Sequence, residues 1–489
     1  MEINNKDRIS TLNFTNDQQK AYSNLIEFIN SPYNINDYKR ALIGPAGTGK
    51  TYLVKALIKN SNMNYSQIGL ATPTHKACRV LAESIGISNI KVNTLASDLG
   101  LKPNFDAAKF DITNIPFDPK GKIKIGDYAL YILDEASMVN KGLLFLLEKI
   151  AKKEKCKIIY IGDGSQLPPP KELYSSAFKG IKIESLKQIV RQDDTNPVKD
   201  LLNILRYDIE HKSFYFLEYI SKTKELINDK TGEGFVVCNT NEFNQQVYNY
   251  FNNETLTKNV DYCKVIAYTN LCVSSWNKAI RHAIIEDSEK SIITKNDLIL
   301  SYTTLVNQFN DIVLSDSDEY IIQDIVNYVH PDYEIKGFLI KFTAIHGGKV
   351  TTPIFVVNHK DQYSINKYVQ ISDNLIESAK TSSVNFRASR WKEYYKFKES
   401  CLILADILSN DGRTIKYKRN LDYGFALTAH KSQGSTFDNV LVDVDDIVYD
   451  LRRNMFWDDV EQINRRLYVA CSRCRNKLFL KWNGKINSI

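Results

Sequence analysis

The stretch "RALIGPAGTGKTYL", residues 40–53, decides the fold of the first half of the chain. Its apolar start indicates a short buried strand, and residues 50–60 carry apolar side chains at helical spacing. The turn between them fits the pattern G-x-x-x-x-G-K-[ST] and consists of Gly44, Pro45, Ala46, Gly47, Thr48, Gly49, Lys50 and Thr51. A glycine-rich loop between a strand and a helix holds phosphates with its backbone N–H groups. Because this context disfavours a chance glycine-rich turn, the sequence predicts a nucleotide site, with Lys50 on the β- and γ-phosphates and Thr51 on Mg²⁺.

Further apolar runs along the chain end in polar residues. Three of them lie at residues 67–74, 127–137 and 155–169, and a second series begins near residue 263. Strands that alternate with helices predict a parallel sheet with helices on both faces, and the chemistry then gathers at the carboxyl ends of the strands. The stretch 290–415 instead holds short β-like runs. We therefore expect two α/β domains, the second interrupted by a mainly β insertion.

Acidic and amide side chains stand where two of these runs end. Asp134 and Glu135 follow one strand, and Gln166 follows the next in "GDGSQLPP". Beside a phosphate loop, the first acid is suited to holding Mg²⁺, the second to acting as general base, and Gln166 to touching a γ-phosphate or its water. Taken alone, the acidic pair is equally typical of a helix N-cap and Gln166 of a proline-ended loop.

A cation supplied near the γ-phosphate accelerates phosphoryl transfer. Arg191 in "LKQIVRQ" and Arg473 in "YVACSRCR" are the candidates, although most single arginines are solvated surface charges. Cys471 and Cys474 form the only C-x-x-C, and two sulfurs without a second pair do not complete a zinc site. We interpret them as structural thiols.

Composition narrows the class of protein. The chain has 489 residues, 43% hydrophobic side chains and a formal net charge of +7. These values are typical of a multidomain globular protein, and the mild basic excess suits a polyanionic partner without requiring one. The first residues, "MEINNKDRIS", have no apolar signal core, and no apolar run reaches about 18 residues. We expect a cytoplasmic protein, in a host cytoplasm if a phage encodes it.

In this order, the motifs resemble those of superfamily 1B DNA helicases, the 5′→3′ class, and most of all the phage Dda-type helicases. The similar segments are "FTNDQQKAY" (14–22), "GPAGTGKT" (44–51), "ATPTHKACRVL" (71–81), "LDEAS" (133–137), "GDGSQLPP" (162–169), "VRQ" (190–192), "AYTN" (267–270), "TAHKSQGSTFDNV" (428–440) and "LYVACSRCR" (467–475). The resemblance spans nearly the whole chain and matches the insertion only loosely. It also departs at "VNTLASDLG" (92–100), where Ala96 stands in place of an expected histidine.

The resemblance implies an α/β fold with two RecA-like P-loop motor domains and two inserted domains. It places the first motor domain at 1–99 and 127–190, a pin or wedge insertion at 100–126, the second motor domain at 191–289 and 416–489, and an SH3-like, mainly β insertion at 290–415. ATP would lie in the cleft between the motors with Mg²⁺. Gln18 would contact the adenine, Arg191 the γ-phosphate, and Arg473 and Gly434 would face the nucleotide from the second motor.

The resemblance also assigns contacts with single-stranded DNA. They are Thr72, Pro73, Thr74, His75 and Thr94 in the first motor and Thr269, Asn270, Thr428, His430 and Lys431 in the second. In the pin, Phe110 would stack against the fork, and packing within its own small domain is an equally good interpretation. The basic, aromatic stretch 387–400 is either a DNA contact or a helix packed on the motor; its near-helical aromatic spacing favours packing.

The sequence therefore predicts an ATP-dependent DNA helicase that moves 5′→3′ on single strands and unwinds duplexes, in phage-type replication, recombination or repair. Its expected partners are single-stranded DNA, duplex forks and single-strand-binding or replication proteins, and we expect a functional monomer. Two alternatives stay open. One is an ATP-driven remodeller or nucleic-acid switch that does not unwind, and the other is a RecD-like subunit that is active only within a larger complex.

Overall fold

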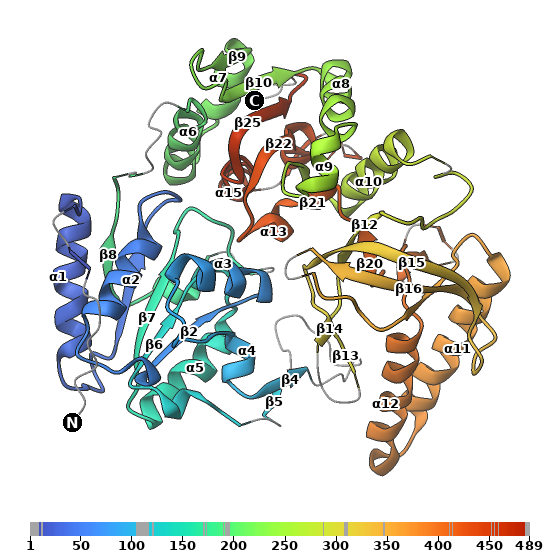
Figure 1. The fold of residues 1–489 in the computed structure, drawn as a ribbon, viewed down its shortest axis with the longest axis horizontal. Coiled ribbons are helices and arrows are strands. Elements are labelled where there is room, and N and C mark those ends of the chain that lie inside the picture. The colour runs from blue at the N-terminus through green and yellow to red at the C-terminus, as the bar shows by residue number, and fades with distance from the viewer. Residues whose placement is uncertain are drawn as a thin grey trace.

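A computed structural model gives the arrangement of the chain. It describes residues 9–10, 13–103, 117–119, 122–169, 172, 174–188, 190, 196–286, 288–307, 312–345, 348–409, 411–412, 414–450, 452–453, 455–457 and 459–484. Three bodies are visible in Figure 1: a blue-to-teal α/β unit, a green-and-red α/β unit, and a yellow-to-orange unit of strands and helices.

The first motor domain is built on a six-stranded parallel sheet in the order β3-β2-β6-β7-β1-β8. Its strands are β1 (Lys39–Ile43), β2 (Ile68–Thr72), β3 (Val92–Thr94), β6 (Leu130–Leu133), β7 (Lys157–Gly162) and β8 (Lys182–Ser185). Its helices are α1 (Asn16–Asn30), α2 (Lys50–Asn60), α3 (His75–Ile85), α4 (Leu95–Asp98) and α5 (Lys141–Lys153). Strands β2, β6 and β7 are buried throughout because helices cover both faces, which explains their continuous apolar runs.

The pin segment leaves this domain as a hairpin. Strands β4 (Leu101–Pro103) and β5 (Phe117–Pro119) pair antiparallel, with Leu101 opposite Pro119. Phe110, which we predicted to stack at the fork, lies outside the described residues.

The second motor domain repeats the design with a sheet in the order β21-β11-β22-β25-β10-β9. Its strands are β9 (Glu225–Ile227), β10 (Gly234–Cys238), β11 (Cys263–Ala267), β21 (Ala426–Thr428), β22 (Phe437–Asp443) and β25 (Cys474–Lys481). Among these described strands, the edge strand β9 pairs antiparallel with β10, and the other four pairs are parallel. Its helices are α6 (Val198–His211), α7 (Tyr215–Lys222), α8 (Thr240–Phe251), α9 (Glu254–Lys258), α10 (Asn270–Ile284), α13 (Ala429–Ser432), α14 (Val444–Val448) and α15 (Val460–Cys471), with a small ribbon of β23 (Tyr449–Asp450) and β24 (Met455–Phe456).

The insertion contains an antiparallel sheet in the order β17-β16-β15-β12-β20. These strands are β12 (Leu298–Ser301), β15 (Glu319–Val329), β16 (Lys336–Ala344), β17 (Ile354–Val357) and β20 (Leu421–Tyr423). Short ribbons accompany it: β13 (Leu305–Val306) with β14 (Ile312–Leu314), and β18 (Ile407–Leu408) with β19 (Ile415–Tyr417). The predicted boundary at residue 416 is too early, because β20 still pairs with β12 and the motor sheet resumes only at β21.

Two long helices in the insertion were not predicted as a pair. Helices α11 (Gln362–Thr381) and α12 (Val384–Ser400) lie together as a hairpin (Figure 1). The stretch 387–400 is thus helical, and its Trp391, Tyr394 and Phe397 are buried. The packing interpretation holds, but the core that these side chains join includes α11 and β17 of the insertion rather than the motor.

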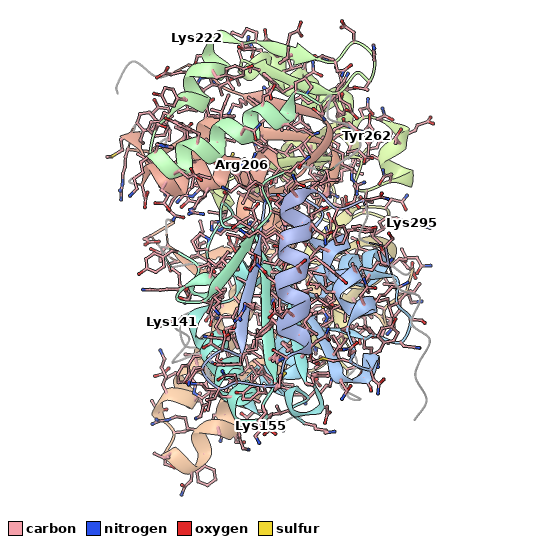
Figure 2. The ribbon with its side chains drawn as sticks, turned by 90° about the vertical axis from the view of Figure 1, so that its left-hand side faces the viewer. Lys141, Lys155, Arg206, Lys222, Tyr262 and Lys295 are labelled. Atoms are coloured by element: carbon pink, nitrogen blue, oxygen red, sulfur yellow. The ribbon has the colours of Figure 1, made fainter. Side chains whose placement is uncertain are left out.

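Seen from the side, the first motor domain presents α1 across its sheet, and the second motor domain lies above it with Arg206 on α6 near the junction (Figure 2). Within the described part of the chain, no helix combines the length and the apolar character needed to cross a membrane.

Candidate functional site

The phosphate loop begins where β1 ends and α2 starts. Gly49 is the N-cap of α2 with φ of +78°, and no side chain caps the helix there. The first N–H groups of α2 are therefore free to face an anion. Gly44 is equally constrained, because a Cβ at that position would lie 2.8 Å from the carbonyl oxygen of Leu186. These two positions require glycine for different reasons, one conformational and one steric.

The lysine of the loop folds back into it. Lys50 Nζ donates to the carbonyl oxygens of Gly44 at 2.6 Å and Pro45 at 2.9 Å. The ammonium thus lies at the mouth of the loop, where phosphate oxygens would replace these carbonyls as acceptors.

Gln18 supports the loop from α1. Its Nε2 donates to the Thr48 carbonyl at 2.9 Å, while its Oε1 accepts from the Thr15 N–H at 3.0 Å. A Cβ on Gly49 would come within 2.5 Å of the Gln18 Nε2. Both ends of the amide are bonded inside the protein, so in this structure Gln18 positions the loop, and the predicted adenine contact requires it to change partners.

The two predicted acids follow β6 at the same edge of the sheet. Glu135 has φ of +51°, a left-handed conformation that costs a non-glycine residue roughly 1–3 kcal/mol. Its Oε2 is buried without a hydrogen-bond partner. Burial, and then the charge of Asp134, raise the pKa of Glu135 to about 7, and Lys50 and Arg473 oppose this shift. A strained, desolvated carboxyl that titrates near neutrality is a suitable general base.

Asp134 completes an acidic pair that is short of positive charge. Burial raises the pKa of Asp134, against the hydrogen bond from the Glu135 N–H and the charge of Lys50. Lys50 acts on both carboxyls, and burial still raises the pKa of each, so the pair is incompletely neutralised. A hard divalent cation with oxygen ligands would relieve this, so the donor set fits Mg²⁺.

Gln166 lies on a loop that the second motor domain holds directly. Arg465 of α15 donates to the carbonyl oxygens of Gly164 at 2.6 Å and Gln166 at 2.9 Å. The Tyr468 hydroxyl donates to Asp163 at 2.7 Å. Gln433 Nε2 reaches the Leu167 carbonyl at 3.2 Å. The loop at 163–167 therefore connects the nucleotide side of the first motor with two segments of the second.

Sequence reasoning missed Gln433, Arg465 and Tyr468 as contacts of this loop. Gln433 stands inside the quoted motif "TAHKSQG", and the other two lie in or just before "LYVACSRCR". These motifs were the only hint in the sequence that the three residues are functional. Which side chains of α15 cross the domain boundary depends on the rotation of that helix about its axis, and the sequence does not give this rotation.

The predicted arginine finger, Arg473, is buried at the end of α15. Its Nη1 donates to the Ser435 carbonyl at 3.1 Å and its Nε to the Val469 carbonyl at 3.1 Å. It is nevertheless close enough to Glu135 for its charge to lower the pKa of that carboxyl. The charge of Arg473 thus acts on Glu135 from the second domain.

Arg191 and Gly434 were also predicted to contact the nucleotide. Arg191 lies outside the described residues; its neighbour Val190 donates its N–H to the Gly47 carbonyl of the phosphate loop at 2.9 Å. Gly434 has φ of +72°, and the atom nearest to a Cβ built there is the Ala77 Cβ of α3, at 3.8 Å. Gly434 therefore lies against α3 rather than against the loop at residues 44–51.

The predicted DNA-contact threonines occupy matching places in the two sheets. Thr74 and Thr94 are N-caps of α3 and α4, after β2 and β3. Thr269 and Thr428 are N-caps of α10 and α13, after β11 and β21. Because β2-β3 and β11-β21 are the equivalent ends of the two sheets, the two motors present similar helix N-termini, which suit strand phosphates.

The remaining predicted DNA contacts lie beside these caps. Thr72 is buried and donates to the Thr74 carbonyl at 2.8 Å, which shapes the turn that contains Pro73. Asn270 is exposed at the start of α10. Burial lowers the pKa of His75, and burial together with Arg466 lowers the pKa of His430 to about 4, so both imidazoles are neutral donors at pH 7. Lys431 is paired with Asp316 of the insertion at 2.8 Å.

Taken together, the fold and site define a two-domain P-loop ATPase in which the second domain reaches into the nucleotide side of the first. Residues 16–219 match the family described as an AAA domain. The chain is 23% identical to the uncharacterised protein R530 of Acanthamoeba polyphaga mimivirus, over 95% of this chain and 99% of the relative. It is 24% identical to the ATP-dependent DNA helicase dda of Enterobacteria phage T4, over 89% of this chain and 92% of that protein.

Among solved structures, the Pif1 helicase from Candida albicans aligns with a TM-score of 0.49 and 18% identity, over 96% of this chain and 95% of that one. The similarity to the phage helicase agrees with the resemblance recognised from the motifs.

Proposed function

We propose that this protein is an ATP-driven DNA helicase that moves 5′→3′ along single strands and opens duplexes. The observation that carries the proposal is the set of hydrogen bonds from Arg465, Tyr468 and Gln433 to the loop at 163–167. This loop follows β7, next to β1 and its phosphate loop in the sheet. A change of nucleotide state at that edge is therefore transmitted to the second motor domain.

The described residues suit hydrolysis of ATP as follows. The phosphate loop and Lys50 bind the β- and γ-phosphates, and Thr51 and Asp134 hold Mg²⁺, which neutralises phosphate charge when bound. Glu135 accepts a proton from the attacking water. Arg473 stabilises the charge that develops on the γ-phosphate, and Arg191 is proposed to share this role. Gln166, held by Arg465, senses whether the γ-phosphate is present.

Movement along the strand requires two DNA-binding sites, one in each motor domain, that bind the strand tightly in alternation. The helix N-termini capped by Thr74 and Thr94 in one motor, and by Thr269 and Thr428 in the other, provide two similar sets of donors. Closing the cleft around ATP would bring these sets together, and hydrolysis would let them separate. We propose that single-stranded DNA and duplex forks are the substrates, that a monomer suffices, and that the role is in phage-type replication, recombination or repair.

The test is unwinding of two duplexes, one with a 5′ single-stranded tail and one with a 3′ tail, with Lys50→Ala as the inactive control. Unwinding of the 5′-tailed duplex alone is expected. Unwinding of only the 3′-tailed duplex would refute the direction and keep the motor. If neither duplex opens while single strands still stimulate ATP hydrolysis, the chain is a remodeller or a subunit that needs partners.

A further inference from the structure

An acidic loop of the insertion lies on the predicted DNA-contact surface. The sequence "SDSDE", residues 315–319, joins β14 to β15. Its shape is fixed by its own hydrogen bonds: the Ser317 N–H donates to the Ser301 carbonyl at 2.8 Å, and the Ser315 N–H donates to the Tyr320 hydroxyl at 2.8 Å. Three carboxylates therefore belong to a turn of defined shape.

Two of these carboxylates pair with cations from both motor domains. Asp318 accepts two parallel hydrogen bonds from Arg79 of α3, at 2.9 and 2.7 Å. Asp316 accepts from Lys431 Nζ at 2.8 Å, and the same ammonium donates to the Ser317 hydroxyl at 2.8 Å. One short loop thus binds a cation of each motor at once.

These cations belong to the surface assigned to the strand. Lys431 is itself a predicted DNA contact, and Arg79 lies one helical turn after the predicted contact His75 on α3. Asp318 and Asp316 are also the carboxylates whose charges act on the His75 imidazole. The loop therefore covers the place where helix α3 of one motor approaches α13 of the other.

Glu319, the third carboxylate, has a different environment. It lies in the interior between Lys264, at 2.5 Å, and Lys76, at 3.3 Å. Burial alone would raise the pKa of Glu319, but the two ammonium groups outweigh it and hold the pKa at about 2. This buried triad fixes the base of the loop to both motors, so Glu319 is an anchor.

The other two pairs differ in exposure: the Asp318 side chain is 9% exposed and its partner Arg79 is 35% exposed, whereas the Asp316 pair is more open. The side chains of Asp316 and Lys431 are 49% and 25% exposed, and exposed ion pairs contribute little to stability. The Arg79 fork binds carboxylate and phosphate with the same geometry, so a phosphate can replace Asp318 without loss of hydrogen bonds. A cavity of about 270 Å³ borders this pair, and Lys349 and Thr351 contribute to its lining. The exchange thus has both a matching donor and adjacent space.

We propose that Asp316 and Asp318 occupy the positions of two strand phosphates on a cationic surface formed by Arg79 and Lys431, and that single-stranded DNA displaces them when it binds. The inference rests on the proposed function and adds Arg79 to the strand-binding residues. The loop is then an internal competitor: when no strand is present, Asp316 and Asp318 add two ion pairs to the link that Glu319 makes between the motors. A bound strand removes these two pairs, and the Glu319 anchor stays in place.

The experiment is binding of a fluorescent single-stranded oligonucleotide, followed by anisotropy without nucleotide at several salt concentrations. Asp316→Asn/Asp318→Asn is compared with Asp324→Asn/Asp332→Asn, which removes the same charge from exposed positions of the same insertion. We expect about tenfold tighter binding for the first variant only, since two ion pairs of moderate strength no longer compete. Its affinity should also fall more steeply with salt, by roughly one to two units of log–log slope, because its freed cations now exchange counterions for phosphates.

Arg79→Gln provides the reciprocal test. It should weaken strand binding and make the affinity less dependent on salt, whereas an arginine that serves only to join domains would change neither. Thermal unfolding is recorded for each variant. If the double variant does not fold, Asp316→Asn alone carries the same comparison, with a gain of about threefold because a single exposed pair is removed.

The outcomes separate this inference from the proposed function. Suppose that the wild-type protein binds and unwinds normally. If Asp316→Asn/Asp318→Asn then binds single strands no more tightly than the wild type, the proposal that this loop competes with the strand is refuted. A tightening by Asp324→Asn/Asp332→Asn of the same size would show a general charge effect and would also overturn it. A wild-type protein that neither binds single strands nor unwinds either duplex would instead refute the proposed function.

Discussion

Helices α2 and α8 stand at equivalent places in the two motor domains and begin in opposite ways. Each follows the fifth strand of its sheet, β1 in one order and β10 in the other. Helix α2 starts at a left-handed glycine with no side-chain cap. Helix α8 starts at Asn239, whose side chain accepts from the N–H groups of Asn241 and Glu242, and the Glu242 side chain accepts from Asn239 in return.

The difference shows how one architecture serves two roles. A capping box uses up the orphan N–H groups of a helix and stabilises the fold. A helix that starts at glycine leaves those groups for a ligand and forgoes that stability. The open N-terminus of α2 therefore suits a nucleotide phosphate, whereas the capped N-terminus of α8 does not.

The largest effect is expected from Lys50→Ala. Removing the ammonium that faces the loop takes away phosphate binding and charge neutralisation together, so ATP hydrolysis should fall by about a thousandfold or more. Steady-state ATPase with saturating single strands measures it. Lys141→Ala, an exposed lysine at the start of α5 (Figure 2), is the matched control and should keep wild-type turnover. Substantial hydrolysis by Lys50→Ala would break the assignment of this loop as the active one.

Arg473→Ala tests the contribution of the second motor. Hydrolysis should fall on the order of a thousandfold while nucleotide affinity changes only a few-fold, because the charge that it stabilises develops in the transition state. Nucleotide binding and single-turnover hydrolysis separate the two quantities.

Because Arg473 also bonds to the Ser435 and Val469 carbonyls, a Tm measurement must accompany this variant. Arg475→Ala removes a neighbouring exposed arginine and serves as its control. A loss of Tm with unchanged turnover per folded molecule would reduce Arg473 to a structural residue.

Glu135→Gln should still bind ATP and should lose hydrolysis by about 10²–10⁴-fold, the range for a general base. Since the pKa of Glu135 is raised to about 7, the carboxyl is protonated below that pH and ionised above it. The kcat/KM of the wild type should therefore rise as pH increases through about 7. A pH–rate profile checks this, and the step should vanish in Glu135→Gln but persist in the exposed control Glu83→Gln. A profile that is flat from pH 6 to 8 in the wild type would exclude Glu135 as the titrating base.

The smallest effect is expected at the equivalent helix of the second motor. Asn239→Ala should lower the free energy of unfolding by about 1 kcal/mol, the usual value of an N-cap, with no change in ATP hydrolysis. Chemical denaturation measures it, with Asn241→Ala in the same turn as control. The companion change Gly49→Ala should strongly impair hydrolysis, because the φ of +78° at Gly49 strains any residue with a Cβ and would distort the phosphate loop. If Asn239→Ala impaired hydrolysis as well, the contrast between the two helices would fail.

Local patterns predicted the parts of the nucleotide site that lie next to one another in the sequence. The phosphate loop and the pair Asp134 and Glu135 were predicted because a parallel sheet brings the ends of its strands to one edge. The contacts of the loop at 163–167 were not predicted, because Arg465 lies 299 residues from Gln166 and Tyr468 lies 305 residues from Asp163, and they meet the loop only when the motors dock. Gln18 was assigned to the adenine, whereas its amide is bonded to Thr15 and Thr48.

Local sequence patterns also predicted only part of the insertion. Its short strands were expected, but the α11–α12 hairpin and the pairing of β20 with β12 were not, because strand pairing and not local composition sets where a domain ends. The role of the acidic loop was also invisible in the sequence, where "SDSDE" has the appearance of a solvated turn.

By itself, the sequence determined the phosphate loop and its place between a strand and a helix, since phosphate binding depends on backbone geometry that a few adjacent glycines dictate. Only the tertiary structure decided which charges meet across domains. The charge of Arg473 acts on Glu135, Arg465 holds the loop of Gln166, and the carboxylates of Asp316 and Asp318 pair with Lys431 and Arg79. Electrostatic contacts depend on distance in space, and the folding of three domains against one another sets those distances.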